Sequence, residues 1–269
     1  AVYIETIRNI PLLLQIFFWY FGVLRGLPSP GNSINLFDSY FLNIRGLYSP
    51  SPVFEEGFSL ILWALIVAFI IIYLISKWSR KRQDETGEQF PVFFASLGLI
   101  ISLPFIASII TGFPLSWEYP ELEGFNFTGG FVIIPELVAL SLALSLYTAS
   151  FIAEIVRGGI MAINRGQTEA SYALGLQTRL TLRLVIIPQA LRVIIPPLTN
   201  QYLNLTKNSS LAAAIAYPDL VLVFAGTVLM QTGQAVEIIA ITMGVYLAIS
   251  LIISAFMNWY NKKMALVES

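Results

Sequence analysis

The chain of 269 residues contains no cysteine and no histidine, and only 12% of its residues are charged. Without these side chains, a Cys/His zinc site, haem ligation by histidine, a thiol nucleophile and an imidazole general base are all excluded. The formal net charge of −1 and a pI near 5.6 provide no basic field for nucleic acid. We therefore expect no metal site, no nucleic-acid partner and, for this chain, no hydrolytic or metal-dependent chemistry.

Apolar side chains dominate instead. They make up 57% of the chain, and the mean hydropathy of +0.75 lies outside the usual balance of a soluble domain. Long uncharged runs match the roughly 20 residues of one helical crossing, and they favour helices over a barrel of alternating strands. The sequence predicts an all-α, multi-span transmembrane bundle with six spans, at about residues 10–27, 58–76, 91–112, 131–156, 185–206 and 236–260.

Lysine and arginine are concentrated on one side of this predicted bundle, and short cytoplasmic connections are the ones that retain positive charge. The basic side carries Arg8, Lys77, Arg80, Lys81, Arg82, Arg157, Arg165, Arg179, Arg183, Lys262 and Lys263. The opposite side carries only Arg25, Arg45 and Lys207. We therefore predict that both ends of this sequence, and the connection 157–184, are cytoplasmic.

The connection 113–130 falls on the outer side and is acidic, with Glu118, Glu121 and Glu123 beside Trp117 and Tyr119. It is interpreted either as a solvated loop with aromatic anchors at the interface or as a docking surface for an external protein.

A short polar segment, GQTEASYALGL at residues 166–176, interrupts the apolar spans on the cytoplasmic side. Asn164 followed three residues later by Gln167 is similar to a capping box, and Gly175 is well placed just past a helix end. The segment predicts a short helix from about Arg165 to Leu174.

That helix would present small side chains and one charge. Ala170, Ser171 and Ala173 would let the groove of another protein approach the backbone, and Glu169 would offer an anchoring charge. The alternative is an amphipathic helix that lies at the membrane surface without a partner.

The fifth predicted span combines prolines with amides. Pro188, Pro196 and Pro197 each remove a backbone donor, so we expect a broken helix there. Beyond the expected break, polar side chains follow helical spacing, with Asn200, Asn204 and Lys207 on one face and Gln201 and Asn208 alongside. The amides either join helices together or line the path of a small polar substrate.

Three carboxylates lie near the ends of predicted spans. Glu154 and Arg157 are three residues apart and can pair, as a structural or a gating contact. Glu136 and Glu237 each lie near the start of a span, where a helix N-terminus favours a carboxylate. A lone intramembrane carboxylate could also couple transport to protons, and that hypothesis stays open.

The cytoplasmic segment resembles a known motif. In GQTEASYALGLQTRLTLRLVIIPQ, Glu169-Ala170-Ser171 is followed by Gly175 and then by Val185-Ile186-Ile187-Pro188. This pattern is similar to the EAA loop of ABC importer permeases, with Ser for the second Ala, Val for Ile and Ile for Leu. The resemblance implies that 157–184 is a cytoplasmic EAA loop, whose short helix fits a cleft in an ATPase through Gly166, Glu169, Ala170, Ser171 and Gly175.

The resemblance covers nearly the whole chain. Further segments match the polar amino-acid permeases of the histidine/glutamine type, most of all the general L-amino acid permeases: RNIPLLLQIFFWYF, YTASFIAEIVRGGI, LNLTKNSSLAAAIAYPDL and QTGQAVEIIAITMGVYLAISLIISAFMNWYN. The resemblance implies one transmembrane permease domain over 1–269, of the type I importer kind, in a bacterial inner membrane. It also implies at least one upstream span, which fits a sequence that starts at Ala1 without Met.

The expected partners follow from the resemblance as well. They are a second permease chain, homologous in a heterodimer or identical in a homodimer, two ATPase subunits that bind ATP and Mg, an extracytoplasmic binding protein, amino-acid substrate and membrane lipid. The sequence itself contains no G-x-x-x-x-G-K-[ST] motif that could hold ATP phosphates. Two alternatives remain, namely an ion- or proton-coupled carrier that acts alone and, more weakly, a membrane enzyme.

Overall fold

The structure is a computed structural model that describes residues 2–264, and side chains to residue 263. The predicted cytoplasmic location of the chain ends therefore concerns, in part, residues 1 and 265–269, which lie outside the described residues. The chain forms two compact units. Unit 1 contains residues 1–29, 44–46 and 133–269, and unit 2 contains residues 30–43 and 47–132.

Unit 1 begins with a sharply bent pair of helices. Helix α1 (Val2–Asn9) is followed by a second helical stretch made of α2 (Leu12–Phe17), the π-helical turn η1 (Phe18–Val23) and the short η2 (Leu24–Gly26), and the two stretches meet at 100°. The bend falls at Pro11, because the residue before a proline is disfavoured in the α-helical region. The first predicted span is therefore one arm of a bent pair.

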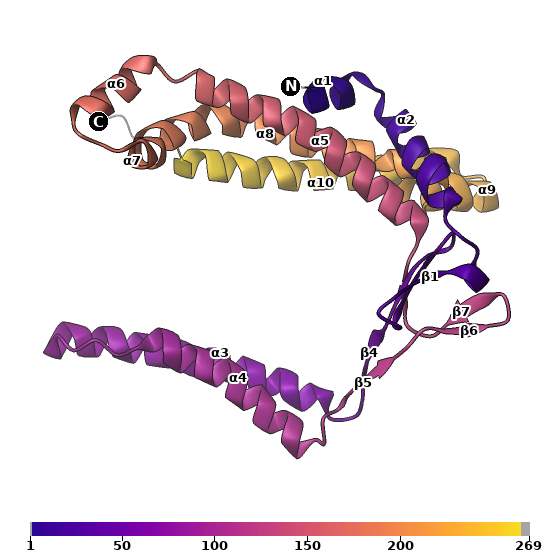
Figure 1. The fold of residues 1–269 in the computed structure, drawn as a ribbon, viewed down its shortest axis with the longest axis horizontal. Helices are drawn as coiled ribbons and strands as arrows, with labels where there is room; N and C mark the ends of the chain where they lie inside the picture. The colour runs from indigo at the N-terminus through magenta and orange to yellow at the C-terminus, as the bar shows by residue number, and fades with distance from the viewer. Residues whose placement is uncertain (1, 265–269) are drawn as a thin grey trace. The chain divides into compact units, whose positions relative to one another are not determined.

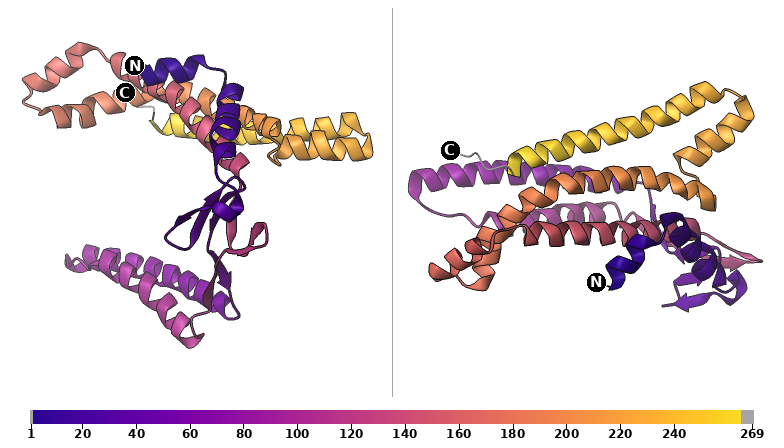
Figure 2. Two further views of the ribbon diagram at one scale, coloured as in Figure 1. Left: turned by 45° about the vertical axis from the view of Figure 1, so that its right-hand side comes forward. Right: turned by 90° about the horizontal axis from the view of Figure 1, so that it is seen from above.

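The rest of unit 1 is a set of long helices packed lengthwise. These are α5 (Pro135–Met161), α8 (Ile187–Asn208) and α10 (Ala235–Met264), with α8 in contact with both of the others. They run side by side in Figures 1 and 2. The remaining elements are short: α6 (Arg165–Ala173), α7 (Thr178–Thr181), η4 (Leu182–Ile186), η5 (Ser209–Ile215), η6 (Val221–Val228) and α9 (Leu229–Thr232).

The predicted break of the fifth span at its prolines is wrong. Helix α8 passes Pro196 and Pro197 without interruption, and helical structure continues over Thr178–Ile215. Pro188 closely follows the π-helical turn η4, and a local π-helical adjustment can satisfy the backbone groups that a proline leaves free. The other two prolines lie in a segment that packs against α5 and α10, and neighbouring helices can support the freed carbonyls.

The core of unit 1 lies where the bent pair meets α5. It is built from buried side chains of α2, η1, η2, α5 and η5, namely Leu12, Ile16, Tyr20, Leu24, Ala139, Leu140, Ala143, Ala212 and Ile215. Alanine at the α5 positions lets the helices approach closely, which is how helices associate in lipid. Apolar side chains elsewhere on the long helices are largely exposed, as lipid-facing surfaces require.

Unit 2 contains a pair of contacting helices, α3 (Phe58–Thr86) and α4 (Val92–Ile110). Helix α3 is ten residues longer than the predicted span, which ended at 76. The additional residues, 77–86, are helical and include most of the charged segment that was predicted as a connection. There Lys81 pairs with Glu85 at 3.7 Å, and Gly87 ends the helix with φ +73°. Charged pairs at this spacing support an exposed helix.

Short strands form in the two segments that flank this helix pair in sequence, mostly where the sequence predicted loops. They are β1 (Ile34–Leu36), β2 (Tyr40–Asn43), β3 (Gly46–Ser49), β4 (Ser51–Phe54), β5 (Leu115–Glu118), β6 (Glu121–Glu123), β7 (Asn126–Thr128) and β8 (Phe131–Ile133), with the 3-10 turn η3 (Pro30–Asn32). They pair as β1-β2-β3-β8, β4-β5 and β6-β7. The Phe127 ring packs between two other rings in this region. Its centroid lies 4.7 Å from that of Phe41 and 5.0 Å from that of Tyr48.

The described residues contain five helical segments that are long and apolar enough to cross a membrane, or six if the bent pair counts as one span. The predicted all-α, multi-span architecture is confirmed. The strands add a small extramembrane part to it.

Close packing of α5 on α8 yields a stability prediction. A Cβ on Gly159 would lie 2.3 Å from Ile194 Cγ1 and 3.4 Å from the Ala190 carbonyl oxygen. Gly159→Val should therefore lower the free energy of unfolding by about 1–3 kcal/mol through overpacking, measured as thermal stability in detergent. Gly158→Val is the control, because a Cβ at Gly158 meets nothing within 4 Å. Equal losses in the two variants would contradict the close contact.

Candidate functional site

The predicted cytoplasmic helix is present as α6, and its N-terminus is capped. The Asn164 side-chain oxygen accepts a hydrogen bond from the Gly166 backbone N–H at 2.8 Å. Gln167 does not provide the second half of a capping box in the described contacts, because its Oε1 accepts from Gln189 Nε2 of α8 at 3.3 Å. The side chain that was expected to cap α6 therefore connects it to α8.

The C-terminus of α6 ends in a Schellman motif. Gly175 has φ +76°, and its N–H donates to the Tyr172 carbonyl at 2.9 Å. The Leu176 N–H donates to the Ser171 carbonyl at 3.1 Å. These two bonds satisfy carbonyls that would otherwise be free at the helix end. The predicted stop at Gly175 is confirmed, and α6 is a helix of fixed length.

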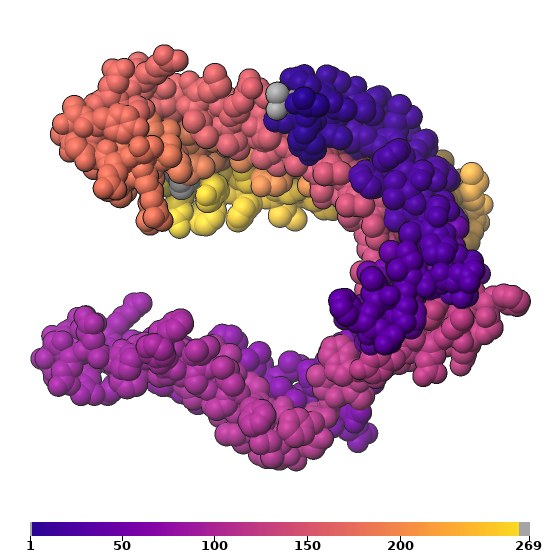
Figure 3. Space-filling model, viewed as in Figure 1, coloured from indigo at the N-terminus to yellow at the C-terminus, as the bar shows by residue number. Residues whose placement is uncertain are grey.

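The two faces of α6 differ. Ser171 is buried, and its hydroxyl donates to the Gln167 carbonyl at 2.7 Å. Glu169 and Ala170 are exposed, as is Leu174, with 81% of its surface accessible. The expectation that small residues cluster on an open face therefore fails for Ser171, which faces this chain. Figure 3 shows the segment around α6 at one end of unit 1.

Helix α8 contributes amides to a polar recess. Gln201, Asn204 and Asn208 line it together with Leu205. Helix α5 contributes Tyr147, Thr148 and Phe151, and the recess has a volume of about 240 Å³. The structure thus brings together three of the four amides that the sequence singled out.

Two members of the predicted polar stripe lie elsewhere. Asn200 is exposed and does not line the recess. Lys207 lines a different, mainly apolar hollow against η6 and α10. Helical spacing places Asn200, Asn204 and Lys207 along one side of α8. Of these three residues, only Asn204 lines the recess.

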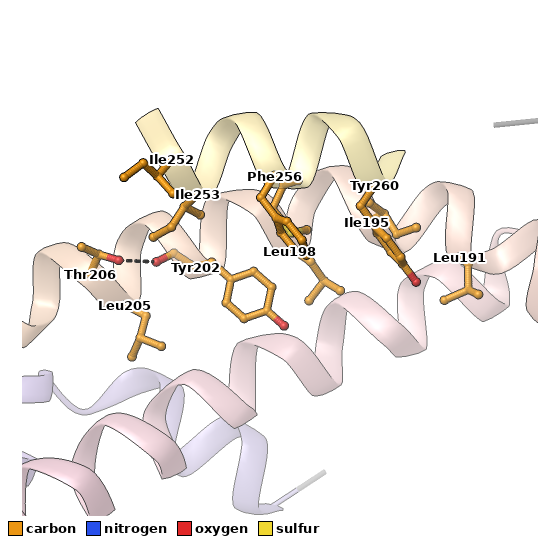
Figure 4. A pocket seen from close by; sticks show the side chains of 11 residues that line it. Leu191, Ile195, Leu198, Tyr202, Leu205, Thr206, Ile252, Ile253, Phe256 and Tyr260 are labelled. Carbon is orange, nitrogen blue, oxygen red and sulfur yellow. Dashed lines mark hydrogen bonds between the residues drawn. The ribbon is translucent and has the colours of Figure 1, made fainter. Parts of the chain in front are cut away.

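The opposite side of α8 is apolar. A groove of about 700 Å³ runs between α8 and α10, and its lining includes Ile195, Leu198 and Tyr202 of α8 and Phe256 and Tyr260 of α10 (Figure 4). Its one drawn hydrogen bond is internal to α8, from the Thr206 hydroxyl to the Tyr202 carbonyl at 3.1 Å. Helix α8 thus has an amide face toward α5 and an apolar face toward α10.

Glu154 and Arg157 form the predicted pair, with a carboxylate-to-guanidinium distance of 3.4 Å. Both side chains are partly solvent-exposed, at 37% and 62%, so the pair contributes little to stability.

Glu136 belongs to a network that the sequence did not reveal. Its carboxylate accepts from the Tyr20 hydroxyl at 2.7 Å, and Arg25 donates to the same hydroxyl oxygen at 2.6 Å. The Arg25 guanidinium also lies 5.0 Å from the centre of the Tyr20 ring. Tyr20 and Glu136 are 116 residues apart, so no local pattern could have paired them. Glu136 is therefore not a lone carboxylate, while Glu237 is exposed.

Within residues 2–264, no three acidic side chains gather in a way that could hold a metal ion.

Comparisons with known proteins give a consistent result. Residues 1–266 match the family model described as "Binding-protein-dependent transport system inner membrane component". The chain is 57% identical over its full length to YhdX of Escherichia coli K12, whose name describes an amino-acid ABC transporter permease, and it covers 68% of that protein. It is 54% identical to the general L-amino acid transport system permease protein AapQ of Rhizobium johnstonii, again over its full length and 67% of the relative.

A solved structure shares the fold. The crystal structure of an amino acid ABC transporter with histidines matches 97% of this chain and 73% of its own chain. The TM-score is 0.51 and the sequence identity is 20%.

The cap of α6 can be tested directly. Asn164→Ala removes the acceptor for the Gly166 N–H and should cost about 0.5–2 kcal/mol of local helix stability. Faster amide hydrogen exchange in α6 than in the unchanged protein would show this. Asn164→Asp keeps an acceptor and serves as the control. If exchange in α6 is the same in the Ala and Asp variants, the side chain does not hold the helix start.

Proposed function

The chain belongs to the family of inner membrane components of binding-protein-dependent transport systems, and we propose that it moves amino acids while a separate subunit hydrolyses ATP. Proteins of this family are multi-pass transport subunits and not enzymes by themselves. The finer assignment concerns how the chain is coupled to ATP, which partners it has and which way it faces.

The observation that carries the coupling proposal is the construction of α6. A nine-residue helix outside the spans is capped at both ends, and it exposes one carboxylate beside Ala170 and Leu174. A helix that is already formed loses little conformational entropy when it docks. Glu169 and its exposed neighbours are therefore proposed as the surface that enters a cleft of the ATPase, with Gly166 and Gly175 at its ends. Ser171 supports this surface from behind.

We propose that a movement of α6 is passed on to the membrane-spanning helix α8. Gln167 of α6 is bonded to Gln189 of α8, and α6 also contacts η4, which leads into α8. Because α8 is continuous from Ile187 to Asn208, a displacement at Gln189 acts on the whole helix. We propose that closure of two ATPase subunits around ATP and Mg tilts α8 and so alternates access to the path, by favouring one of two states.

The remaining partners follow from the family. We propose a second, homologous permease chain, an extracytoplasmic binding protein that delivers the amino acid, and a bacterial inner membrane as the location. The excess of lysine and arginine on the α6 side supports a cytoplasmic α6 and cytoplasmic chain ends.

Charge reversal on α6 tests the coupling. Glu169→Lys should lower ATP hydrolysis stimulated by the loaded binding protein by about tenfold or more, because it replaces an attractive contact with a repulsive one. The measurement is ATPase activity of the assembled transporter in liposomes. Glu85→Lys, a reversal at an exposed position on α3, is the control. Full stimulation in the Glu169 variant would overturn the docking of α6.

The proton-coupled alternative is tested at Glu136. A carrier of that kind needs a carboxylate that titrates, whereas the Tyr20–Glu136 contact needs only an acceptor. Glu136→Gln retains an acceptor oxygen and should keep most of the ATP-driven uptake, with an unchanged dependence on pH. Uptake that disappears in this variant while the protein stays folded would favour proton coupling.

A further inference from the structure

The apolar groove between α8 and α10 is long enough for a lipid acyl chain. Its lining on α8 runs from Leu191 to Thr206, a length of about 22 Å at 1.5 Å per residue. One leaflet of a bilayer contributes about 15 Å of hydrocarbon, half of the roughly 30 Å core. Ile252 and Phe256 of the lining are 68% and 60% exposed, so the groove is open to its surroundings on one side. An acyl chain therefore finds a continuous apolar surface over the depth of a leaflet.

One end of this groove is followed by positive charge. Figure 4 shows Tyr260 of α10 at the end of the groove where Leu191 of α8 lies. Lys263 follows Tyr260 by three residues and Phe256 by seven, so it continues the same face of α10 beyond the groove. The Lys263 Nζ lies 5.5 Å from the centre of the Trp259 ring. An exposed tryptophan beside a lysine is typical of the level at which hydrocarbon meets lipid headgroups.

Arg192 adds a second cation, because it is next to Leu191 on α8 and lies within a membrane span. Its Nε is buried without a hydrogen-bond partner among the described residues, and none of the ion pairs that these residues form includes it. Helix α8 contains no acidic residue, and the described carboxylate of α10, Glu237, lies at the other end of that helix. On α5, Glu154 is paired with Arg157. A guanidinium inside a span is costly without an anion, and α8 and α10 do not provide one here.

We propose that one anionic phospholipid occupies this groove, with an acyl chain along α8 and α10 and its phosphate bound by Arg192 and Lys263. Basic sites between membrane helices recognise lipid headgroups in this way, because the cations attract the anionic lipids of their leaflet. A guanidinium suits the phosphate oxygens, to which it can donate two hydrogen bonds. The bound lipid would connect the start of α8 to the end of α10 and neutralise charges that have no acidic partner on these helices. The site goes beyond the transport function proposed above and does not depend on it.

Quenching by brominated lipids tests the headgroup preference at the groove. The chain contains no cysteine, so Phe256→Cys places the one thiol of this chain there, and a fluorophore attached to it reports on the adjacent lipid. In liposomes that hold the assembled transporter, brominated phosphatidylglycerol should quench it at an about tenfold lower mole fraction than brominated phosphatidylcholine with the same acyl chains. Val193→Cys is the control, because Val193 is 46% exposed and does not line the groove. The two lipids should quench a fluorophore at position 193 equally, and equal quenching at position 256 would overturn the proposal.

Charge variants identify the residues that hold the headgroup. Arg192→Gln and Lys263→Gln should each reduce the preference for phosphatidylglycerol at position 256 by about fivefold, the contribution of one basic side chain near a lipid surface. Lys262→Gln removes the same charge from the adjacent residue, which points to another side of α10, and should leave the preference unchanged. Arg192→Lys retains the charge and should keep most of the preference. Equal losses in the variants at 262 and 263 would overturn the assignment.

Other occupants of the groove give different results. If a second protein chain fills it, neither brominated lipid quenches the fluorophore at position 256. If the two cations bind only free phosphate, glycerol phosphate in the aqueous phase abolishes the preference for phosphatidylglycerol. Either result would overturn the lipid site. None of these measurements requires ATP or an amino acid, so a failure of the lipid site and a failure of the proposed transport function are distinguishable.

Discussion

A peptide group inside a bilayer has no water to bind, so each backbone donor and acceptor must find its partner within the chain. The long helices of both units satisfy this requirement, and the strands lie at the ends of the spans. The same constraint accounts for α8, which continues past Pro196 and Pro197. At helix ends outside the spans, side chains and turns provide the hydrogen-bond partners of the backbone, as at the two ends of α6.

The continuity of α8 connects the two functional regions of unit 1. One end of this helix is bonded to α6 through Gln189 and Gln167, and the other end carries Gln201, Asn204 and Asn208. Under the proposed coupling, an unbroken α8 would pass a displacement at Gln189 on to the recess, whereas a helix broken at its prolines would bend between the two. The face of α8 toward α10 is apolar.

Much of the architecture could be predicted from local chemistry. Uncharged runs indicated the spans, and Asn164 and Gly175 indicated both ends of α6, because capping depends on residues that are neighbours in sequence. Pairing over long separations could not be predicted. Tyr20 and Glu136 meet only in the fold, and the short strands had no clear alternation. The rotation of α8 decided that Asn204 lines the recess while Lys207 does not. The prolines of α8 led to a wrong prediction of a helix break, because packing against α5 and α10 outweighs the loss of the backbone hydrogen bonds that they remove.

We propose that amino acids cross the membrane along this chain and that ATP hydrolysis drives the crossing. The most direct test is uptake of a labelled amino acid into liposomes that contain the assembled transporter, with all ion gradients collapsed and the binding protein on the uptake side. We predict accumulation above the external concentration when ATP is supplied at the α6 side, and none without it. Accumulation that needs an ion gradient and proceeds without nucleotide would contradict ATP-driven transport.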